Sequence, residues 1–334
     1  MTAENSATHR TAIAVASPAD GPAQAGSGTA ADADAGPGVA AQAPAGGSGT
    51  LLAMFGVVAF SLTFPSTAWG LESFGPWSLV SLRSLLAAAV AGGVLAGRVP
   101  VPARRHWGGL AVVAGGVVVG FPLLTTLALR TTTTSHAAVV VGLLPLTTAV
   151  FSSLRTGSRP PRAFWAAAVA GAAVVIAFTV QQSGGALSAG DLYLFGALLV
   201  CAAGYTEGGR LARVMPGWQV IGWALILALP AAVAGAAIAL PFEPVRLTAH
   251  GVAGLVWVAV GSTFVGLYVW YRGMAEIGVA RASQLQLAQP LLTLAWSALL
   301  LGEEIPTAAP VASVAVLVCI AVTQRAGVEA ARRS

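Results

Sequence analysis

A series of apolar runs from Leu51 onward limits what this chain can fold into more than any other feature. Each run is about 20 residues long, the length at which an α-helix crosses a hydrocarbon core of about 30 Å. With 56% hydrophobic and 9% charged residues and a mean hydropathy of +0.80, a soluble domain would have almost no polar side chains for its surface. The sequence therefore predicts an all-α integral membrane protein with ten transmembrane helices, near 51–71, 77–97, 108–129, 135–154, 163–180, 190–209, 218–240, 251–271, 279–301 and 307–324.

The arginines predict the orientation of these spans. With the N-terminus in the cytoplasm, only Arg130 and Arg246 fall in outer loops. The cytoplasmic ends hold Arg98, Arg104, Arg105, Arg155, Arg159, Arg162, Arg210, Arg213, Arg272, Arg281, Arg325, Arg332 and Arg333. Because positive residues collect on the cytoplasmic side, we expect both termini to be cytoplasmic.

An internal repeat appears when the chain is shifted on itself by 145 positions, which aligns residues 107–176 with 252–321. The informative matches are the prolines, glycines and hydroxyl residues: Pro145 with Pro290, Thr148 with Thr293, Ser152 with Ser297, Gly157 with Gly302 and Pro161 with Pro306. Equivalent positions are five spans apart, an odd number, so the two copies are expected to be inverted in the membrane. Inverted repeats are typical of secondary transporters.

These observations predict four segments. Residues 1–50 are rich in Ala, Gly, Pro, Ser and Asp and should form a disordered cytoplasmic tail without a signal peptide. Residues 51–180 and 190–325 form the first and second five-helix repeats, and 326–334 form a cytoplasmic C-terminal tail.

The ninth span is the best candidate for a substrate-binding helix. Gln286, Gln289, Thr293 and Trp296 share one side of a helical wheel, close to Pro290. A polar and aromatic seam of this kind either lines a cavity or forms hydrogen bonds between helices. Its counterparts in the fourth span are Thr148 and Ser152, which we also predict to bind substrate.

Two of the charged residues inside the predicted spans are candidates for a role in transport. Arg83 lies about 10 Å from the outer end of the second span, where it either binds a substrate carboxylate or extends outward to Glu72. Glu207 lies toward the inner end of the sixth span and is a candidate proton carrier, whereas pairing with Arg210 would make it a structural residue.

The chain also resembles a known family, the EamA-type permeases of the drug/metabolite transporter superfamily. The motifs that carry the resemblance are Gly75-Pro76 with Arg83, the fourth-span Pro145, Gly190-Asp191, and Ala282 with Pro290 and Gly302-Glu303. Many relatives have Trp-Gly in the first span, where this chain reads Phe60-Ser61. The resemblance implies an inner-membrane exporter of small metabolites or drugs, such as amino-acid-like or nucleoside-like compounds.

We therefore expect a secondary transporter that exports a small organic metabolite by alternating access, with proton exchange as its coupling. A facilitative uniporter or channel is the alternative, and an intramembrane enzyme or a sensor would need groups or domains that the sequence lacks. No Walker motif, cofactor fingerprint, catalytic triad or metal-ligand spacing is visible, so we expect no cofactor. All 17 basic residues are Arg, which with the Ala and Gly excess is typical of a high-GC bacterial genome. The expected partners are the substrate and the lipid bilayer, not nucleic acid, and a homodimer is left open.

Overall fold

Helices make up every regular element of the part of the chain that the structure describes. The computed structural model describes residues 47–157, 160–277 and 285–333, so the tail expected over 1–50 lies outside it except where α1 begins. The predicted helical class is confirmed. The helices are α1 Gly47–Ser61, α2 Thr63–Ser73, α3 Pro76–Leu95, η1 Arg104–His106, α4 Trp107–Val113, η2 Ala114–Gly120, α5 Phe121–Ala128, α6 Thr134–Val141, α7 Leu144–Thr156, α8 Arg162–Gln182, α9 Ala189–Leu211, α10 Gly217–Ala239, α11 Ala249–Val256, η3 Trp257–Gly266, α12 Leu267–Ile277, α14 Gln289–Leu301 and α15 Ala308–Arg333.

Eight helical stretches among the described residues are long and apolar enough to cross a membrane. They are Ser48–Ser73, Pro76–Leu95, Arg104–Ala128, Thr134–Arg155, Arg162–Gln182, Ala189–Leu211, Gly217–Ala239 and Ala249–Trp270, which correspond to the first eight predicted spans. The ninth and tenth predicted spans correspond to two shorter apolar helices, Gln289–Leu301 and Ala308–Thr323, and the start of the ninth predicted span, 279–284, lies outside the described residues. The chain is thus a multi-pass membrane protein. Its last helix, α15, continues past the predicted end of the tenth span to Arg333.

Several of these stretches are not continuous α-helices, which the sequence analysis did not expect. The first span is interrupted at Leu62, between α1 and α2, and the fourth span turns at Gly142 and Leu143 before α7 begins. The third and eighth spans contain π-helical segments, η2 and η3. Proline explains the turn in the fourth span, because Pro145 lacks the N–H that would continue the helical hydrogen-bond ladder.

The same irregularities occur twice, at the spacing of the sequence repeat. Gly142 and Leu143 form the turn in the fourth span, and Leu287 and Ala288, 145 positions later, form the turn that precedes α14. The π-helical segments η2 and η3 overlap under the same shift. Gly157 and Gly302 both end their helices with a left-handed backbone, at φ of 67° and 64°. The backbone thus repeats together with the sequence.

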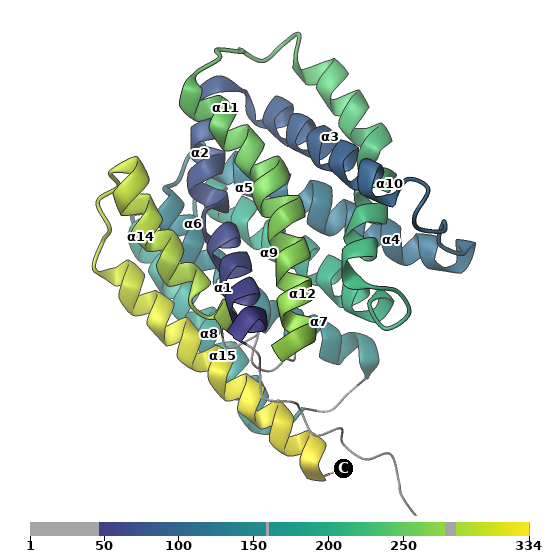
Figure 1. Cartoon of the computed structure of the whole chain (residues 1–334). Helices are drawn as coiled ribbons and strands as arrows, with labels where there is room; N and C mark the ends of the chain where they lie inside the picture. Colours follow the sequence, from purple (N-terminus) through teal and green to yellow (C-terminus); the bar gives the residue numbers. More distant parts are fainter. Residues whose placement is uncertain (1–46, 158–159, 278–284, 334) are drawn as a thin grey trace, which may run out of the picture. The chain divides into compact units, whose positions relative to one another are not determined.

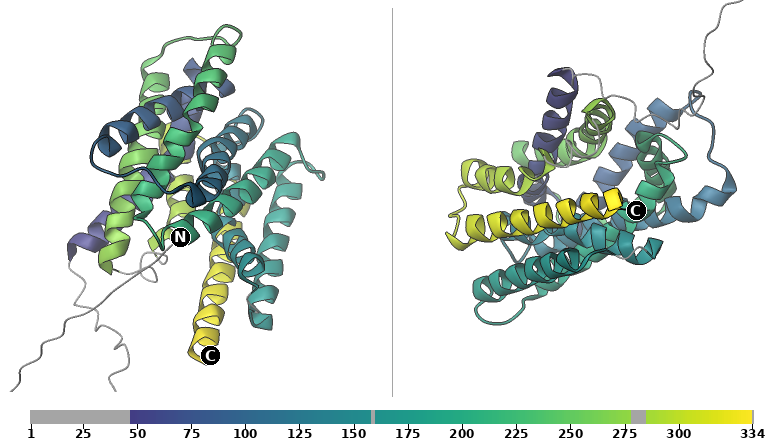
Figure 2. Two further views of the ribbon diagram at one scale, coloured as in Figure 1. Left: turned by 90° about the vertical axis from the view of Figure 1, so that its right-hand side faces the viewer. Right: turned by 90° about the horizontal axis from the view of Figure 1, so that it is seen from below.

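The helices of the two repeats interleave rather than form separate bundles. In Figure 1, α3 lies beside α10 and α1 beside α12, and each pair joins the first half of the sequence to the second. Figure 2 shows α15, in yellow, running along α8. One apolar core cluster accordingly contains Val140 of α6, Leu194 of α9, Leu294 of α14 and Val316 of α15.

Candidate functional site

The break in the first span is the point at which the predicted ninth-span residues make contact. Pro65 has no N–H to donate to the carbonyl of Ser61, four residues earlier, so that carbonyl needs another partner. Thr293 of α14 supplies it: its Oγ1 donates to the Ser61 carbonyl at 3.0 Å. Trp296 Nε1 donates to Ser61 Oγ at 2.9 Å. Ser61 is fully buried, so this contact is shielded from solvent.

The two glutamines of the predicted seam lie on either side of the turn that precedes α14. Gln286 and Gln289 are both half-buried, and among the described residues neither side chain has a hydrogen-bond partner. Gln289 contributes its backbone carbonyl, which accepts a second bond from Thr293 Oγ1 at 3.0 Å. The seam therefore combines side chains already bonded to the first span with amides free to bond elsewhere.

A second set of polar contacts extends from the same break toward Arg83. Thr63, the first residue of α2, shares a hydrogen bond with Ser262 of η3, with 2.6 Å between the hydroxyl oxygens. The neighbouring Thr263 accepts a hydrogen bond from Arg83 Nη2 at 3.0 Å. Together with Ser61, these residues join Arg83 of the second span to the ninth-span seam. We call this set the polar path; it consists of Arg83, Thr263, Ser262, Thr63, Ser61, Thr293 and Trp296.

The fourth-span candidates belong to a different helix pair. Thr148 and Ser152 are half-buried on α7, which packs mainly against α9. Thr148 Oγ1 donates to the carbonyl of Leu144 in its own helix, at 2.8 Å. The structure thus does not bring Thr148 onto the polar path, although the sequence repeat aligns it with Thr293.

Glu207 contacts two arginines. Its Oε2 accepts from Arg210 Nε at 2.7 Å, the pairing that the sequence analysis considered as the structural alternative. Its Oε1 accepts from Arg155 Nε at 3.1 Å, a contact between α9 and α7 that the sequence spacing did not indicate. Both arginine side chains are more than half exposed, whereas the Glu207 side chain is 12% exposed.

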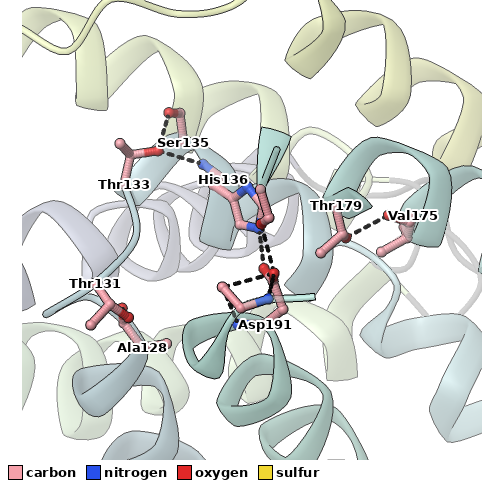
Figure 3. Close-up of polar contacts among 10 residues, drawn as sticks. Ala128, Thr131, Thr133, Ser135, His136, Val175, Thr179 and Asp191 are labelled. Atoms are coloured by element: carbon pink, nitrogen blue, oxygen red, sulfur yellow. Dashed lines mark hydrogen bonds and ion pairs between the residues drawn. The ribbon is translucent and has the colours of Figure 1, made fainter. Parts of the chain in front are cut away.

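A buried histidine and aspartate form a contact that the sequence analysis missed. His136 Nε2 lies 2.7 Å from Asp191 Oδ1, which joins α6 of the first repeat to α9 of the second (Figure 3). The other carboxylate oxygen, Oδ2, accepts from Ser183 Oγ and from the backbone N–H and hydroxyl of Ser188, at 2.7 to 2.8 Å. Asp191 is fully buried and also closes a capping box with Ser188. The sequence gives one indication of this contact: His136 and Asp191 lie near the starts of the fourth and sixth predicted spans, which are expected to begin on the same side of the membrane.

Glu303 makes a second contact between the repeats at this end of the helices. Its carboxylate accepts from the backbone N–H groups of Thr134 and Ser135, at 2.8 and 2.9 Å, and from the Thr134 hydroxyl. A negative group at the N-terminus of α6 satisfies donors that have no partner within the helix and is favourably placed on the helix dipole. Glu303, in the Gly-Glu motif after α14, therefore connects the end of the ninth span to the start of the fourth through these hydrogen bonds.

We also searched the described residues for clusters of metal-ligating side chains and for cavities. No group of three or more His, Cys, Asp or Glu side chains comes together there. A hollow of about 410 Å³ lies where α2 ends and α3 begins, lined by Glu72, Arg130, Glu243 and Arg246 among others. No residue of the polar path lines it, so the hollow and the polar path are separate features.

Comparison with known proteins identifies the family of the chain. The model of the EamA-like transporter family matches the chain twice, over residues 47–180 and 188–324. An uncharacterized transporter of Bacillus subtilis (strain 168), YdeK, is 41% identical over 286 residues, which cover 83% of this chain and 97% of that protein. A protein of known crystal structure has the same fold, with a TM-score of 0.59 and 22% identity over 82% of this chain and 96% of its own. The resemblance found in the sequence is thereby confirmed, and the chain belongs to the EamA-like transporter family, whose members are membrane transport proteins rather than enzymes.

Proposed function

We propose that this protein is a proton-coupled secondary transporter that exports a small organic metabolite across the bacterial plasma membrane by alternating access. The proposal includes ten spans in two inverted repeats, 51–180 and 190–325, with both termini in the cytoplasm. The substrate contacts that we propose come from Gln286, Gln289, Thr293 and Trp296 together with Arg83, and from Thr148 and Ser152 at a later stage of transport.

The observation that carries the proposal is the pairing of helix breaks from the two repeats. The interrupted first span meets α14 directly after the turn at Leu287 and Ala288, and Thr293 bonds to the carbonyl that Pro65 leaves free. Inside a bilayer, irregular backbone is tolerated only where it is buried in protein or lines a cavity. Broken helices at a repeat interface are the usual place for substrate binding in secondary transporters.

Alternating access is supported by the hydrogen bonds that the proposed substrate-binding side chains already make to Ser61. In this conformation Thr293 and Trp296 both donate hydrogen bonds to Ser61, so a substrate must replace those bonds or bind after the helices have moved apart. At the proposed outer end, Glu303 and the pair of His136 and Asp191 connect the two repeats. Contacts of this kind support closure on the outer side. An open channel would instead need a continuous polar stripe through the bundle.

The proposed coupling leaves Glu207 with two competing roles. A carboxylate that carries protons must become accessible and lose its cationic partners at one stage of the cycle. The contacts with Arg155 and Arg210 support the structural role, since both would stabilise the ionised carboxylate where it is. We therefore expect the structural role, with the proton-carrier role as the alternative, and separate measurements of driven uptake and substrate exchange distinguish the two.

Transport itself is tested by reconstituting the purified full chain in liposomes. We expect at least one compound of a panel of amino acids, nucleosides and organic acids to accumulate under a pH gradient, above the level of protein-free liposomes. Gln289→Leu should reduce this flux, whereas Gln182→Leu, a matched change at an exposed position of α8, should not. Equal flux with and without protein across the whole panel would refute the proposal.

A further inference from the structure

Arg83 is a buried cation with one hydrogen-bond partner among the described residues. It stands near the middle of α3, and the residue is 9% exposed. A guanidinium group has five N–H donors, and among the described residues only a single bond is recorded, from Nη2 to Thr263 Oγ1 at 3.0 Å. The Thr263 hydroxyl donates its own hydrogen bond to the carbonyl of Val258, so it serves Arg83 only as a neutral acceptor.

No carboxylate of the described residues is available to neutralise this charge. Asp191 is occupied by His136, Ser183 and Ser188, and Glu207 by two arginines. Glu243 and Glu303 accept from backbone N–H groups at the starts of α3 and α6. Three other acidic side chains are placed by the structure. Glu72 lies near His250, Glu276 lies near Arg272 and Ser48, and Glu304 is exposed in the loop after α14. The alternative of a pair between Arg83 and Glu72 is therefore not what the structure has.

Such an arrangement is unfavourable unless a negative charge arrives from outside the chain. Ionised groups are rarely buried in a low-dielectric interior without a counter-ion, because hydration is lost and nothing replaces it. Intramembrane arginines that persist commonly belong to a substrate or ion pathway. The place of Arg83 at one end of the polar path, which reaches Thr293 and Trp296, connects it to the proposed substrate contacts.

We propose that Arg83 binds the carboxylate of the transported compound, so that the substrates are organic molecules with a single carboxylate. This inference rests on the proposed transport function and specifies its substrate class. The planar guanidinium group matches a carboxylate with two parallel N–H···O bonds. One cation balances one negative charge, so a phosphate dianion would be left with an uncompensated charge in the same site.

A purely structural role for Arg83 makes different predictions. If the bond to Thr263 served only to hold α3 against η3, then removing the charge would weaken the fold. If Arg83 waits for a substrate anion, the ligand-free protein should be no less stable without the charge, because a buried unpaired cation has been removed. Thermal unfolding of ligand-free Arg83→Gln and Thr263→Val against wild type therefore separates the two roles.

The test compares N-acetyl-L-phenylalanine and N-acetyl-L-leucine with their neutral amides, alongside the metabolite panel, in proteoliposomes. We expect wild type to move the accepted carboxylates about 10- to 100-fold faster than their amides, the range for a hydrogen bond to a charged group. Arg83→Gln should lose this preference and Arg83→Lys should keep part of it. The matched control Arg98→Gln, a change at an exposed arginine outside the polar path, should keep all of it.

Three results would overturn the inference. One is a wild type that moves only neutral or cationic compounds, which would leave the transport proposal intact. Another is an Arg83→Gln variant that still prefers carboxylates. The third is a ligand-free Arg83→Gln variant clearly less stable than wild type, which assigns Arg83 a structural role. If no compound moves at all, the transport proposal fails first, and the stability comparison still decides whether Arg83 is structural.

Discussion

Replacing Asp191 should produce the largest loss of stability of any single carboxylate change in the described residues. Asp191→Ala removes the acceptor for the bond from His136 and for three bonds that converge on Oδ2 from Ser183 and Ser188. It also removes the contact between His136 of α6 in the first repeat and α9 of the second (Figure 3). The donors that remain must then find water or stay unpaired.

The structure allows the size of this loss to be worked out. Removing one partner of a buried ion pair, which His136 and Asp191 form when the imidazole is protonated, costs about 3–5 kcal/mol. Four lost hydrogen bonds at about 1 kcal/mol each give a similar sum. Ser183 and Ser188 are half-buried, so water can replace part of what they lose, whereas His136 is buried. We therefore expect Asp191→Ala to lower the free energy of unfolding by about 2–4 kcal/mol.

Two further variants make the measurement specific. Asp191→Asn keeps one oxygen for the serines and turns an N–H toward His136 Nε2, which can accept in one tautomer of neutral imidazole, so about half of the loss is expected. Glu304→Ala removes an exposed carboxylate from the loop after α14 and should change stability by less than about 0.5 kcal/mol. Unfolding is measured by steric trapping in lipid bicelles. A loss for Asp191→Ala no larger than that for Glu304→Ala would refute the reasoning.

Three other predictions concern topology, the seam and the inner end of the sixth span. Cysteine labelling should place both termini and loop 98–107 in the cytoplasm and Glu303 outside, and an external C-terminus would contradict the ten-span proposal. Thr293→Val should lower the free energy of unfolding by about 1 kcal/mol and slow transport several-fold, because the Ser61 carbonyl loses its partner. The control is Thr206→Val, because the Thr206 hydroxyl bonds only within its own helix; this change should affect neither quantity. Glu207→Gln should reduce protein stability and lower driven uptake and exchange together, as expected of a structural ion pair; lost drive with retained exchange would instead assign it the proton-carrier role.

The helical class, the approximate spans and several local features could be predicted from the sequence, because they depend on neighbouring residues. Pro145 and Pro290 mark where helices restart, and the spacing of Glu207 and Arg210 allows contact along one helix. The break at Leu62 also has a local cause that the sequence contains, because Pro65 leaves the Ser61 carbonyl without its helical partner.

The contacts between helices could not be predicted in the same way. His136 meets Asp191 across 55 positions, and Thr134 meets Glu303 across 169. Which residues meet at such distances depends on how whole helices pack, and a single sequence carries no record of that. Arg83 shows the limit clearly: its place in a span is evident from the sequence, but only the structure shows that no carboxylate it places lies beside the guanidinium group.

The interleaving of the two repeats has a consequence for how the protein is made. While a ribosome inserts the first five helices, α3 has no α10 to pack against, α8 has no α15, and His136 has no Asp191. The first half must therefore wait in the bilayer with polar groups exposed to lipid until the second half arrives. We expect it to be a target for membrane quality control when expressed alone, and to be rescued by co-expression of the second half as a separate chain.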